Sequence, residues 1–392
     1  MILILFLFSI SFALDLKSTI RLTIENSPYI RGLSAERLAY EGKRLSYRSN
    51  LNPTMDIEAG NFGTSKESVS KAPIYKVSYS QPVPYPSLFN ITKEIYRKQL
   101  ESLSYRIESE KNKLAQDVYL LFFQALYLQK LLEVLEEEVK IQREIKDFVE
   151  RSFKLGETTK LEFFRAQREL ELLESEKTLT LARYKALLEE LSAFTGKEIN
   201  SLEGELSLPQ WKDLNLEDVP LFVHYKASQE SLSRLLQAEK ILGRPTYSLS
   251  LTAEKVSDRE YGFRVGVSVS LPIFYARQGE MLEIMSQREL LLAEESSQRL
   301  KAIAQLRSAK RHFLEVSRQV QRLEGELIPQ AKSELELALK SYRLRTITLL
   351  DLSQVRKGYY DLLKRRLELL FQAHVEYAKG IFYGGSSWCG CY

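Results

Sequence analysis

The side chains best suited to chemistry are two carboxylates at matching places in a duplicated pattern. Glu162 and Asp351 each lie a few residues beyond a short break between two helical stretches. A carboxylate near a helix N-terminus is favoured by about 0.3–1 kcal/mol, whereas a ring of carboxylates in a narrow pore attracts cations and resists anions. Both interpretations are compatible with this placement. The nearby candidate partners for these carboxylates are Tyr342, Arg343 and Arg345.

Residue patterns typical of enzymes are missing from the rest of the chain. His224, His312 and His374 are far apart and have neither metal-ligand nor nucleophile-base spacing, and there is no glycine-rich phosphate loop. Cys389 and Cys391 could form a strained local disulfide, bind a soft metal or have no role, and the absence of a nearby histidine favours the last. We therefore expect no enzyme activity, no bound metal and no cofactor.

The segments that must position the carboxylates occur twice. Residues 153–162 align without gaps over residues 342–351, an offset of 189. Upstream, Pro53 corresponds to Pro245 and Pro82 to Pro272, with offsets of 192 and 190. This repetition predicts one duplicated structural unit.

Between these prolines the side chains alternate between apolar and polar. In residues 263–271, for example, Phe263, Val265 and Val267 alternate with Arg264, Gly266 and Ser268. A period of two predicts strands with one apolar face, and each segment approaches the ~9–11 residues of a tilted membrane strand. The four strands are expected within residues 55–59, 75–80, 247–254 and 263–271.

Most of the remaining sequence predicts helices. Glycine and proline are absent from residues 91–155, and apolar residues recur there at steps of four and three, as in a coiled-coil seam. The counterpart, residues 279–342, contains Gly325 and Pro329, where a kink is expected. Shorter helices are expected over residues 16–48, 159–194, 221–242 and 348–378.

Four amphipathic strands cannot cross a bilayer as an open sheet, because the edge amides and carbonyls would be unpaired in hydrocarbon. Closure with identical neighbours solves this problem, and three chains would supply about twelve strands. The helices would then continue the wall as a tube. A soluble sandwich on a helical stalk is the alternative.

Composition and the N-terminus indicate a secreted protein. The 56 basic and 52 acidic residues are spread along the chain, which argues against nucleic-acid binding. No internal stretch was expected to be long and apolar enough for a transmembrane helix. Residues 1–13 predict a signal peptide cut after Ala13, with an N-terminal anchor as the alternative.

Taken in order, these motifs resemble the TolC-type outer-membrane efflux proteins. The resemblance rests on the strand opening Asn52-Pro53, the strand exits Ser80-Gln81-Pro82 and Ser270-Leu271-Pro272, and the two helical breaks. It implies a homotrimer with a shared membrane β-barrel and a periplasmic α-barrel. The implied partners are a periplasmic adaptor and an inner-membrane pump of RND or ABC type. Residues 270–279 resemble the heavy-metal efflux branch.

The resemblance also implies roles for the residues at the breaks. Tyr342, Glu162 and Asp351 match positions that hold the periplasmic entrance shut in this family. Phe153 departs from the family's tyrosine, and Arg345 stands where glycine is usual, which puts the shape of that turn in doubt. The breaks are also the place where an adaptor would dock, at Leu155, Gly156, Thr158, Leu344 and Thr346; the alternative is that these residues form only connecting loops.

The expected fold class is therefore mainly α with a membrane β-barrel portion and two internal repeats. The expected function is an outer-membrane exit duct for efflux or type I secretion, spanning into the periplasm. The alternative is a periplasmic coiled-coil adaptor or scaffold. The expected domains are the signal peptide (1–13), first repeat (14–195), equatorial connection (196–220), second repeat (221–380) and C-terminal tail (381–392).

Overall fold

The computed structural model describes residues 13–48, 51–60, 74–255 and 260–389, which are mostly helical with one small antiparallel sheet. The chain divides into two compact units. Unit 1 comprises the described parts of Met1–Arg31, Ile107–Pro220 and Leu300–Tyr392, and unit 2 those of Gly32–Arg106 and Leu221–Arg299. The elements are β1 (Ala13–Leu14), α1 (Leu16–Asn26), α2 (Pro28–Arg48), β2 (Thr54–Gly60), β3 (Ile74–Val83), α4 (Pro86–Lys154), α5 (Lys160–Thr195), β4 (Ser201–Leu202), a 3₁₀ turn (Leu216–Asp218), α6 (Pro220–Leu242), β5 (Thr246–Lys255), β6 (Tyr261–Ser270), α7 (Gln278–Arg322), a π-helical turn (Leu323–Leu327), α8 (Ile328–Arg343) and α9 (Leu349–Cys389).

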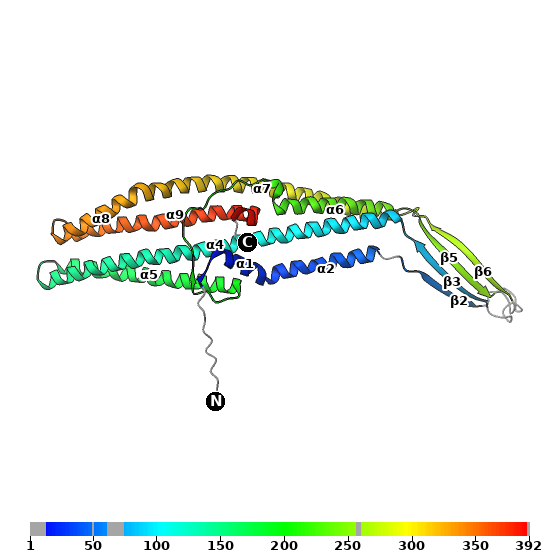
Figure 1. Ribbon diagram of the computed structural model, residues 1–392, viewed down its shortest axis with the longest axis horizontal. Helices are drawn as coiled ribbons and strands as arrows, with labels where there is room; N and C mark the ends of the chain where they lie inside the picture. Colours follow the sequence, from blue (N-terminus) through cyan, green and yellow to red (C-terminus); the bar gives the residue numbers. More distant parts are fainter. Residues whose placement is uncertain (1–12, 49–50, 61–73, 256–259, 390–392) are drawn as a thin grey trace, which may run out of the picture. The chain divides into compact units, whose positions relative to one another are not determined.

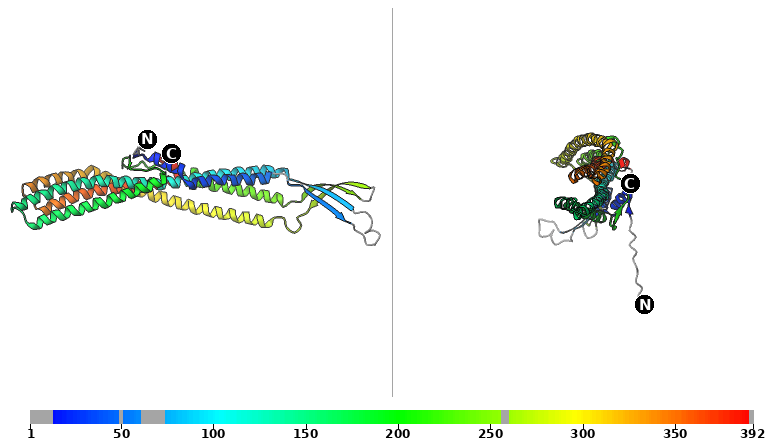
Figure 2. Two further views of the ribbon diagram at one scale, coloured as in Figure 1. Left: turned by 90° about the horizontal axis from the view of Figure 1, so that it is seen from below. Right: turned by 90° about the vertical axis from the view of Figure 1, so that its left-hand side faces the viewer.

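Unit 1 contains two helical hairpins, α4 with α5 and α8 with α9, whose turns lie at the same end of the unit (Figure 1). Figure 2 shows the four helices running side by side within this unit. After its first turn α4 contains neither glycine nor proline, so nothing interrupts its backbone hydrogen bonds. An uninterrupted helix keeps its apolar seam on one side, so the seam can pack along the whole part of α4 that lies in unit 1.

The second long helical stretch is interrupted where the sequence predicts a kink. Leu323–Leu327 form one π-helical turn between α7 and α8, and Pro329 stands in the first turn of α8. Proline has no amide hydrogen to donate, so the regular hydrogen-bond pattern cannot continue through it. Within the π turn, Glu324 accepts a hydrogen bond from Arg366 of α9 at 2.6 Å, which ties the turn to the neighbouring helix.

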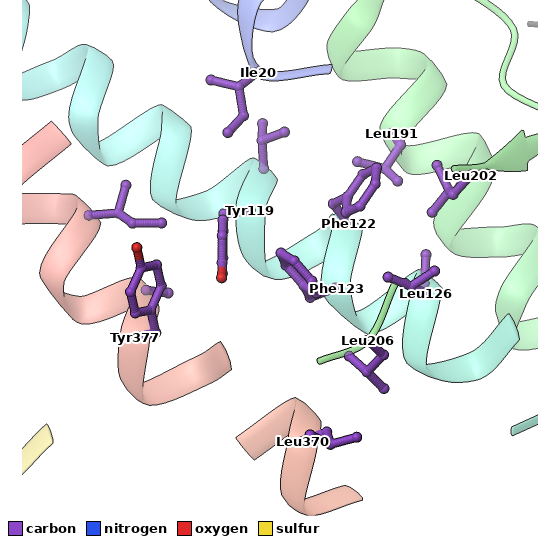
Figure 3. Packing of buried hydrophobic residues seen from close by; sticks show 14 of the residues in the cluster. Ile20, Tyr119, Phe122, Phe123, Leu126, Leu191, Leu202, Leu206, Leu370 and Tyr377 are labelled. Carbon is purple, nitrogen blue, oxygen red and sulfur yellow. The ribbon is translucent and has the colours of Figure 1, made fainter. Parts of the chain in front are cut away.

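The core of unit 1 lies where α1, α4, α5 and α9 meet the connection 196–220 (Figure 3). The connection contributes Leu202 and Leu206 to this core, and its short strand β4 pairs in parallel with β1. Burying these apolar side chains is the main favourable contribution to the fold of the unit. The buried residues at the centre are Ile20, Phe122, Leu126, Leu191, Leu202, Leu206 and Leu370.

One helix in the described part of the chain, α4, includes a window long and apolar enough to cross a membrane. The sequence predicts no such stretch inside the chain. Half of the window is buried inside the structure. The apolar side chains of α4 in unit 1 include Val118, Phe122 and Leu126, which lie in the core, so packing accounts for the hydropathy of this region.

A hydrogen-bond chain crosses the same core. The hydroxyl of Tyr119 lies 2.6 Å from Nδ1 of His374, and Nε2 of this ring lies 2.9 Å from the carbonyl oxygen of Ser207. A carbonyl oxygen can only accept, so the neutral ring donates from Nε2 and accepts the Tyr119 hydroxyl at Nδ1. Phe123 stacks on the imidazole with a centroid separation of 3.6 Å. Burial lowers the pKa of His374 to about 4.

Unit 2 contains a four-stranded antiparallel sheet in the order β2-β3-β5-β6 (Figure 1). The register aligns the alternating residues of neighbouring strands, so that Ile57, Val77, Ala253 and Phe263 form one row across the sheet. The next row along the strands, Asp56, Ser78, Thr252 and Arg264, has its side chains on the opposite face because successive strand residues alternate.

The two faces of the sheet differ in chemistry. Side chains on the polar face bond to one another, as in Ser78 with Thr252 at 3.0 Å and Ser248 with Ser268 at 2.7 Å. The apolar face is left uncovered within the described residues, and Val265 is 81% exposed. The apolar exposed residues are Met55, Ile57, Tyr75, Val77, Tyr79, Tyr247, Leu249, Leu251, Phe263, Val265, Val267 and Val269.

The two outer strands of the sheet each have a neighbour on one side only. Among the described residues β2 pairs with β3, β6 pairs with β5, and neither has a second partner. Each outer strand therefore presents one row of backbone amides and carbonyls without a strand partner.

The predicted helices and strands agree with the observed ones at most ends. The break between α1 and α2 at Ser27, the pairing of β1 with β4 and the extension of α9 to Cys389 were not anticipated. The predicted signal peptide falls on residues 1–12, which lie outside the described residues, and on Ala13. Cys391 also lies outside them, and the side chain of Cys389 is not described.

The buried histidine predicts an acid-sensitive fold. Because the pKa of His374 is about 4 in the folded chain and about 6.5 in an unfolded one, the unfolded state binds more protons between these values, and stability falls as pH falls. We expect a loss of about 2–3 kcal/mol between pH 7 and pH 4.5, measured by urea denaturation. In His374→Gln this pH dependence should shrink, because glutamine can donate and accept without titrating. The exposed His312, changed to glutamine, is the control, and equal acid loss in both variants would contradict the assignment.

Candidate gate at the helical turns

The two turns at the end of unit 1 have the same backbone hydrogen bonds. In the first, Leu155 donates to Arg151, Gly156 to Phe153 and Glu157 to Ser152, at 3.1, 2.9 and 2.8 Å. In the second, the residues 189 positions later make the same three bonds: Leu344 to Lys340, Arg345 to Tyr342 and Thr346 to Ser341, at 3.1, 3.0 and 2.9 Å. The turns are therefore built alike, as the sequence alignment of the two breaks predicts.

The residue at the centre of each turn adopts a left-handed backbone. Gly156 has φ of 75° and Arg345 has φ of 60°. Glycine takes this conformation at no steric cost, whereas a residue with a Cβ is strained there by about 1 kcal/mol. The second turn therefore keeps the shape that the arginine had put in doubt, at the expense of backbone strain.

An ion pair links the two turns. Arg345 Nη2 contacts Glu157 Oε2, so the strained residue of the second turn holds the first. The Arg345 side chain is 56% exposed and that of Glu157 is 37% exposed. An exposed pair of this kind contributes only about 0–1 kcal/mol, so the link can be broken easily. Glu157 was not among the residues singled out from the sequence.

Both candidate carboxylates bond to threonines at the start of the helix that follows their turn. Asp351 Oδ2 accepts hydrogen bonds from the amide and hydroxyl of Thr348, at 3.0 and 2.7 Å, and Thr348 Oγ1 accepts from the Asp351 amide at 3.2 Å. Glu162 donates its amide to Thr159 Oγ1 at 3.3 Å, and its carboxylate accepts from the hydroxyl of Thr158. The Thr348–Asp351 pair is a complete capping box, whereas the first turn has only the half in which the N-cap Thr159 accepts from the Glu162 amide. The bonds from Thr348 lower the pKa of Asp351, so this carboxylate is charged at neutral pH.

Tyr342 lies between the hairpins rather than in solvent. Its ring meets Phe148 of α4 edge to face, with centroids 5.6 Å apart. Burial raises the pKa of Tyr342 to about 12, and the charge of Glu162 adds to the effect, so the phenol stays neutral. Tyr342 and Arg343 line a cavity of about 280 Å³ beside α4, together with Glu144 and Asp147. The structure thus brings Tyr342 near Glu162 and places Arg345 on Glu157.

A buried charged cluster lies between the hairpins and was missed from the sequence. Arg356 of α9 is 5% exposed, bonds to Gln142 Oε1 of α4 and pairs with Glu169 of α5 at 3.2 Å. Ser353 donates to the same Glu169 at 2.8 Å. Gln142 follows Val139 at the next position of the apolar seam of α4. A polar residue on an otherwise apolar seam is the sequence feature that could have indicated this buried cluster.

A second buried pair extends this cluster along the same helices. Lys364 of α9 lies 3.1 Å from Glu138 of α4 and 3.1 Å from Glu176 of α5. Glu138 is buried, and its burial raises the pKa of the carboxyl while Lys364 opposes this. Removing one partner would leave a buried charge uncompensated, so these contacts fix how α9 sits against α4 and α5.

Within the described ranges no group of three or more His, Cys, Asp or Glu side chains could hold a metal ion. The exposed leucines Leu155 and Leu344, at 73% and 76%, form the tips of the turns, with Gly156 and Thr346 also exposed and Thr158 partly covered. The site is therefore a pair of linked turns with apolar tips, capping carboxylates and a weak ion pair. Such a site can hold two hairpins together or release them.

Comparison with protein families gives one match. Residues 19–197 match the family described as outer membrane efflux protein. The family expected from the sequence is thereby confirmed over the first half of the chain. No curated protein matches the sequence of this chain.

Solved structures share the fold over nearly the whole chain. The outer membrane protein VceC of Vibrio cholerae is 11% identical with a TM-score of 0.75, over 93% of this chain and 94% of its own. The CmeC outer membrane channel of Campylobacter jejuni is 14% identical with a TM-score of 0.73, over 95% and 86%. The open state of the MtrE outer membrane channel of Neisseria gonorrhoeae is 16% identical with a TM-score of 0.70, over 94% and 89%. At these identities the likeness shows the fold alone.

The left-handed positions predict that glycine is more stable than alanine at the centre of both turns. Gly156→Ala should destabilise the chain by about 1 kcal/mol through backbone strain alone, since a Cβ there meets nothing within 4 Å. Arg345→Gly and Arg345→Ala both lose the ion pair, so the glycine variant should be more stable than the alanine variant by about 1 kcal/mol. Urea denaturation measures both differences. Equal stability of the two Arg345 variants would show that the left-handed backbone carries no strain.

Proposed function

We propose that this chain is a TolC-like outer membrane efflux protein that forms an exit duct from the periplasm to the exterior. The family match over residues 19–197 and the shared channel fold support this proposal. The duct is passive and catalyses no reaction.

The sheet of unit 2 is the observation that carries the proposal. Its apolar face is exposed along all four strands, which suits contact with lipid, and its opposite face is polar, which suits a wet lumen. Its two outer strands lack a second neighbour among the described residues. In hydrocarbon these unpaired amides and carbonyls would cost several kcal/mol each, so the sheet must close.

Closure with two further copies gives a trimer in which β6 of one chain pairs with β2 of the next. Three chains supply about twelve strands, within the range of outer-membrane barrels. The two halves of the chain, residues 14–195 and 221–380, are then internal repeats, each with a strand pair, a long helix and a returning helix. The connection 196–220 lies between them, and the helices form a periplasmic α-barrel below the membrane barrel.

The turns of unit 1 are the natural gate of such a duct. Around a three-fold axis Glu162 and Asp351 would each be present three times, and their carboxylates would favour cations in a narrow passage. The capping role of Asp351 does not compete with this, because the bonds from Thr348 lower the pKa of Asp351 and favour its charged form. The Arg345–Glu157 ion pair and the Tyr342–Phe148 ring contact would hold the entrance closed. Because an exposed ion pair stabilises this arrangement by only about 0–1 kcal/mol, a partner protein could break it and open the entrance.

The exposed leucines at the turn tips would dock a periplasmic adaptor. Leu155 and Leu344 project from equivalent turns and offer apolar contacts, with Gly156, Thr158 and Thr346 beside them. An inner-membrane pump of RND or ABC type would deliver the transported compound through that adaptor.

The mass of the protein in detergent tests the proposal. Extracted from outer membranes, it should migrate as a particle of three times 45.4 kDa plus bound detergent, and it should aggregate when the detergent is removed. Light scattering coupled to size exclusion measures the protein mass. A monodisperse single copy in detergent-free buffer would instead support the soluble adaptor or scaffold.

Neutralising both carboxylates should change conduction. Glu162→Gln with Asp351→Asn keeps a capping acceptor at each helix start, so the fold should persist while the cation preference in planar bilayers falls. Asp361→Asn, at an exposed position of α9, is the matched control for loss of a carboxylate outside the turns. Conductance and cation preference equal to those of the unchanged protein would remove both residues from the gate.

A further inference from the structure

The contacts between the two hairpins of one chain provide a template for the contacts between chains. In a ring of duplicated chains the first half meets the second half twice, once within each chain and once between neighbours. The intrachain seam is defined here by three contacts: Phe148 with Tyr342, Glu169 with Ser353, and Gln142 with Arg356. Moving each residue by the offset of 189 gives its image in the other half.

The image of the contact between Phe148 and Tyr342 is a pair of apolar residues. Phe148 maps to Leu337 and Tyr342 maps to Phe153. Leu337 is 65% exposed on α8 and Phe153 is 36% exposed at the end of α4. Both positions carry a large apolar side chain, as contact across a buried interface requires.

The image of the second contact places a large aromatic residue opposite a glycine, which has no side chain. Ser353 maps to Phe164 and Glu169 maps to Gly358. Phe164 is 52% exposed on α5, and a Cβ added at Gly358 would meet nothing within 4 Å. The aromatic ring of one chain therefore has a notch of matching position on α9 of the next.

The image of the third contact lacks charge. Gln142 maps to Ala331 and Arg356 maps to Gln167, so the buried arginine has no counterpart. The intrachain seam is held by charges that must be paired as the chain folds, because a lone buried charge is costly. None of the six image residues is charged, which suits surfaces that are exposed first and buried later by association.

We propose that these image residues form an interchain seam in which a second copy of this chain contributes Phe153 and Phe164 against Leu337 and Gly358 of the first. The seam rests on the proposed trimer and specifies how its helical walls meet. The exposed leucines of α5 continue the same surface of the second copy, at Leu161, Leu172 and Leu179.

Cysteine cross-linking tests the seam directly. In a chain carrying Cys389→Ser and Cys391→Ser, Phe153→Cys is combined with Leu337→Cys, and detergent-solubilised protein is treated with a short bismaleimide. Denaturing gels should then show covalent dimers and trimers, while either single variant stays at the mass of one chain. The matched control is Phe148→Cys with Tyr342→Cys, which should close within a chain and add no mass.

The outcomes separate the seam from the duct. If the Phe153/Leu337 pair gives no higher species while the detergent mass is that of a trimer and the control pair reacts, the seam is wrong and the duct stands. If the detergent mass is that of a single chain, both fail. Cross-links to other proteins in whole membranes, without chain-to-chain products, would assign this surface to another partner and overturn the seam.

Filling the notch provides a second measurement. Gly358→Leu favours the helix but blocks the space for Phe164, so the fraction of trimer in detergent should fall roughly tenfold. Lys357→Leu, at the neighbouring exposed position of α9, adds an equal side chain on another side of the helix and should leave the trimer unchanged. Equal trimer content in both variants would contradict the seam.

Discussion

The backbone groups along the two outer strands, β2 and β6, set the main constraint on this protein. A sheet with an exposed apolar face is stable in lipid only if no strand edge is left open, and four strands are too few to close on themselves. The need to close the sheet also constrains the rest of the chain. In the proposed trimer, the copies that close the sheet would also contribute their helices, so the surface of unit 1 would have to accommodate neighbouring chains.

Two kinds of position in unit 1 bear on this requirement: buried charges that are paired within the chain, and the uncharged images of such contacts. Within the chain, Arg356 and Lys364 of α9 are paired with residues of α4 and α5 and are largely removed from water. A shift of α9 along α4 and α5 would separate these ion pairs and leave a buried charge without a partner, which is costly. The uncharged image positions, Ala331 and Gln167, carry no such restriction. In the proposed trimer, a chain would fold its own hairpins together first and then meet its neighbours through uncharged surface.

Sequence patterns predicted the parts of this fold that depend on local order. Alternation over residues 263–271 and the heptad seam of α4 are repeated many times, so single exceptions do not hide them. The missed features depend on single distant contacts. Nothing near His374 in the sequence points to Tyr119 or Ser207, and the two-residue pairing of β1 with β4 is too short for a period. The Arg345–Glu157 link likewise joins residues whose closeness only the packed hairpins create.

The two tip turns share one pattern of backbone hydrogen bonds but differ in the residue at its centre. Identical hydrogen bonds require a left-handed residue in both turns, and the first half meets this with Gly156 at no cost. The second half keeps Arg345 there despite the strain, and in exchange gains a cation that reaches Glu157. Under the same offset this pair maps to Gly156 and Thr346, which cannot form an ion pair. The ion pair of the tip turns therefore has no charged image under this offset. In the proposed trimer, opening the turns would therefore break an ion pair within each chain, while the proposed seam between chains contains no charged residue.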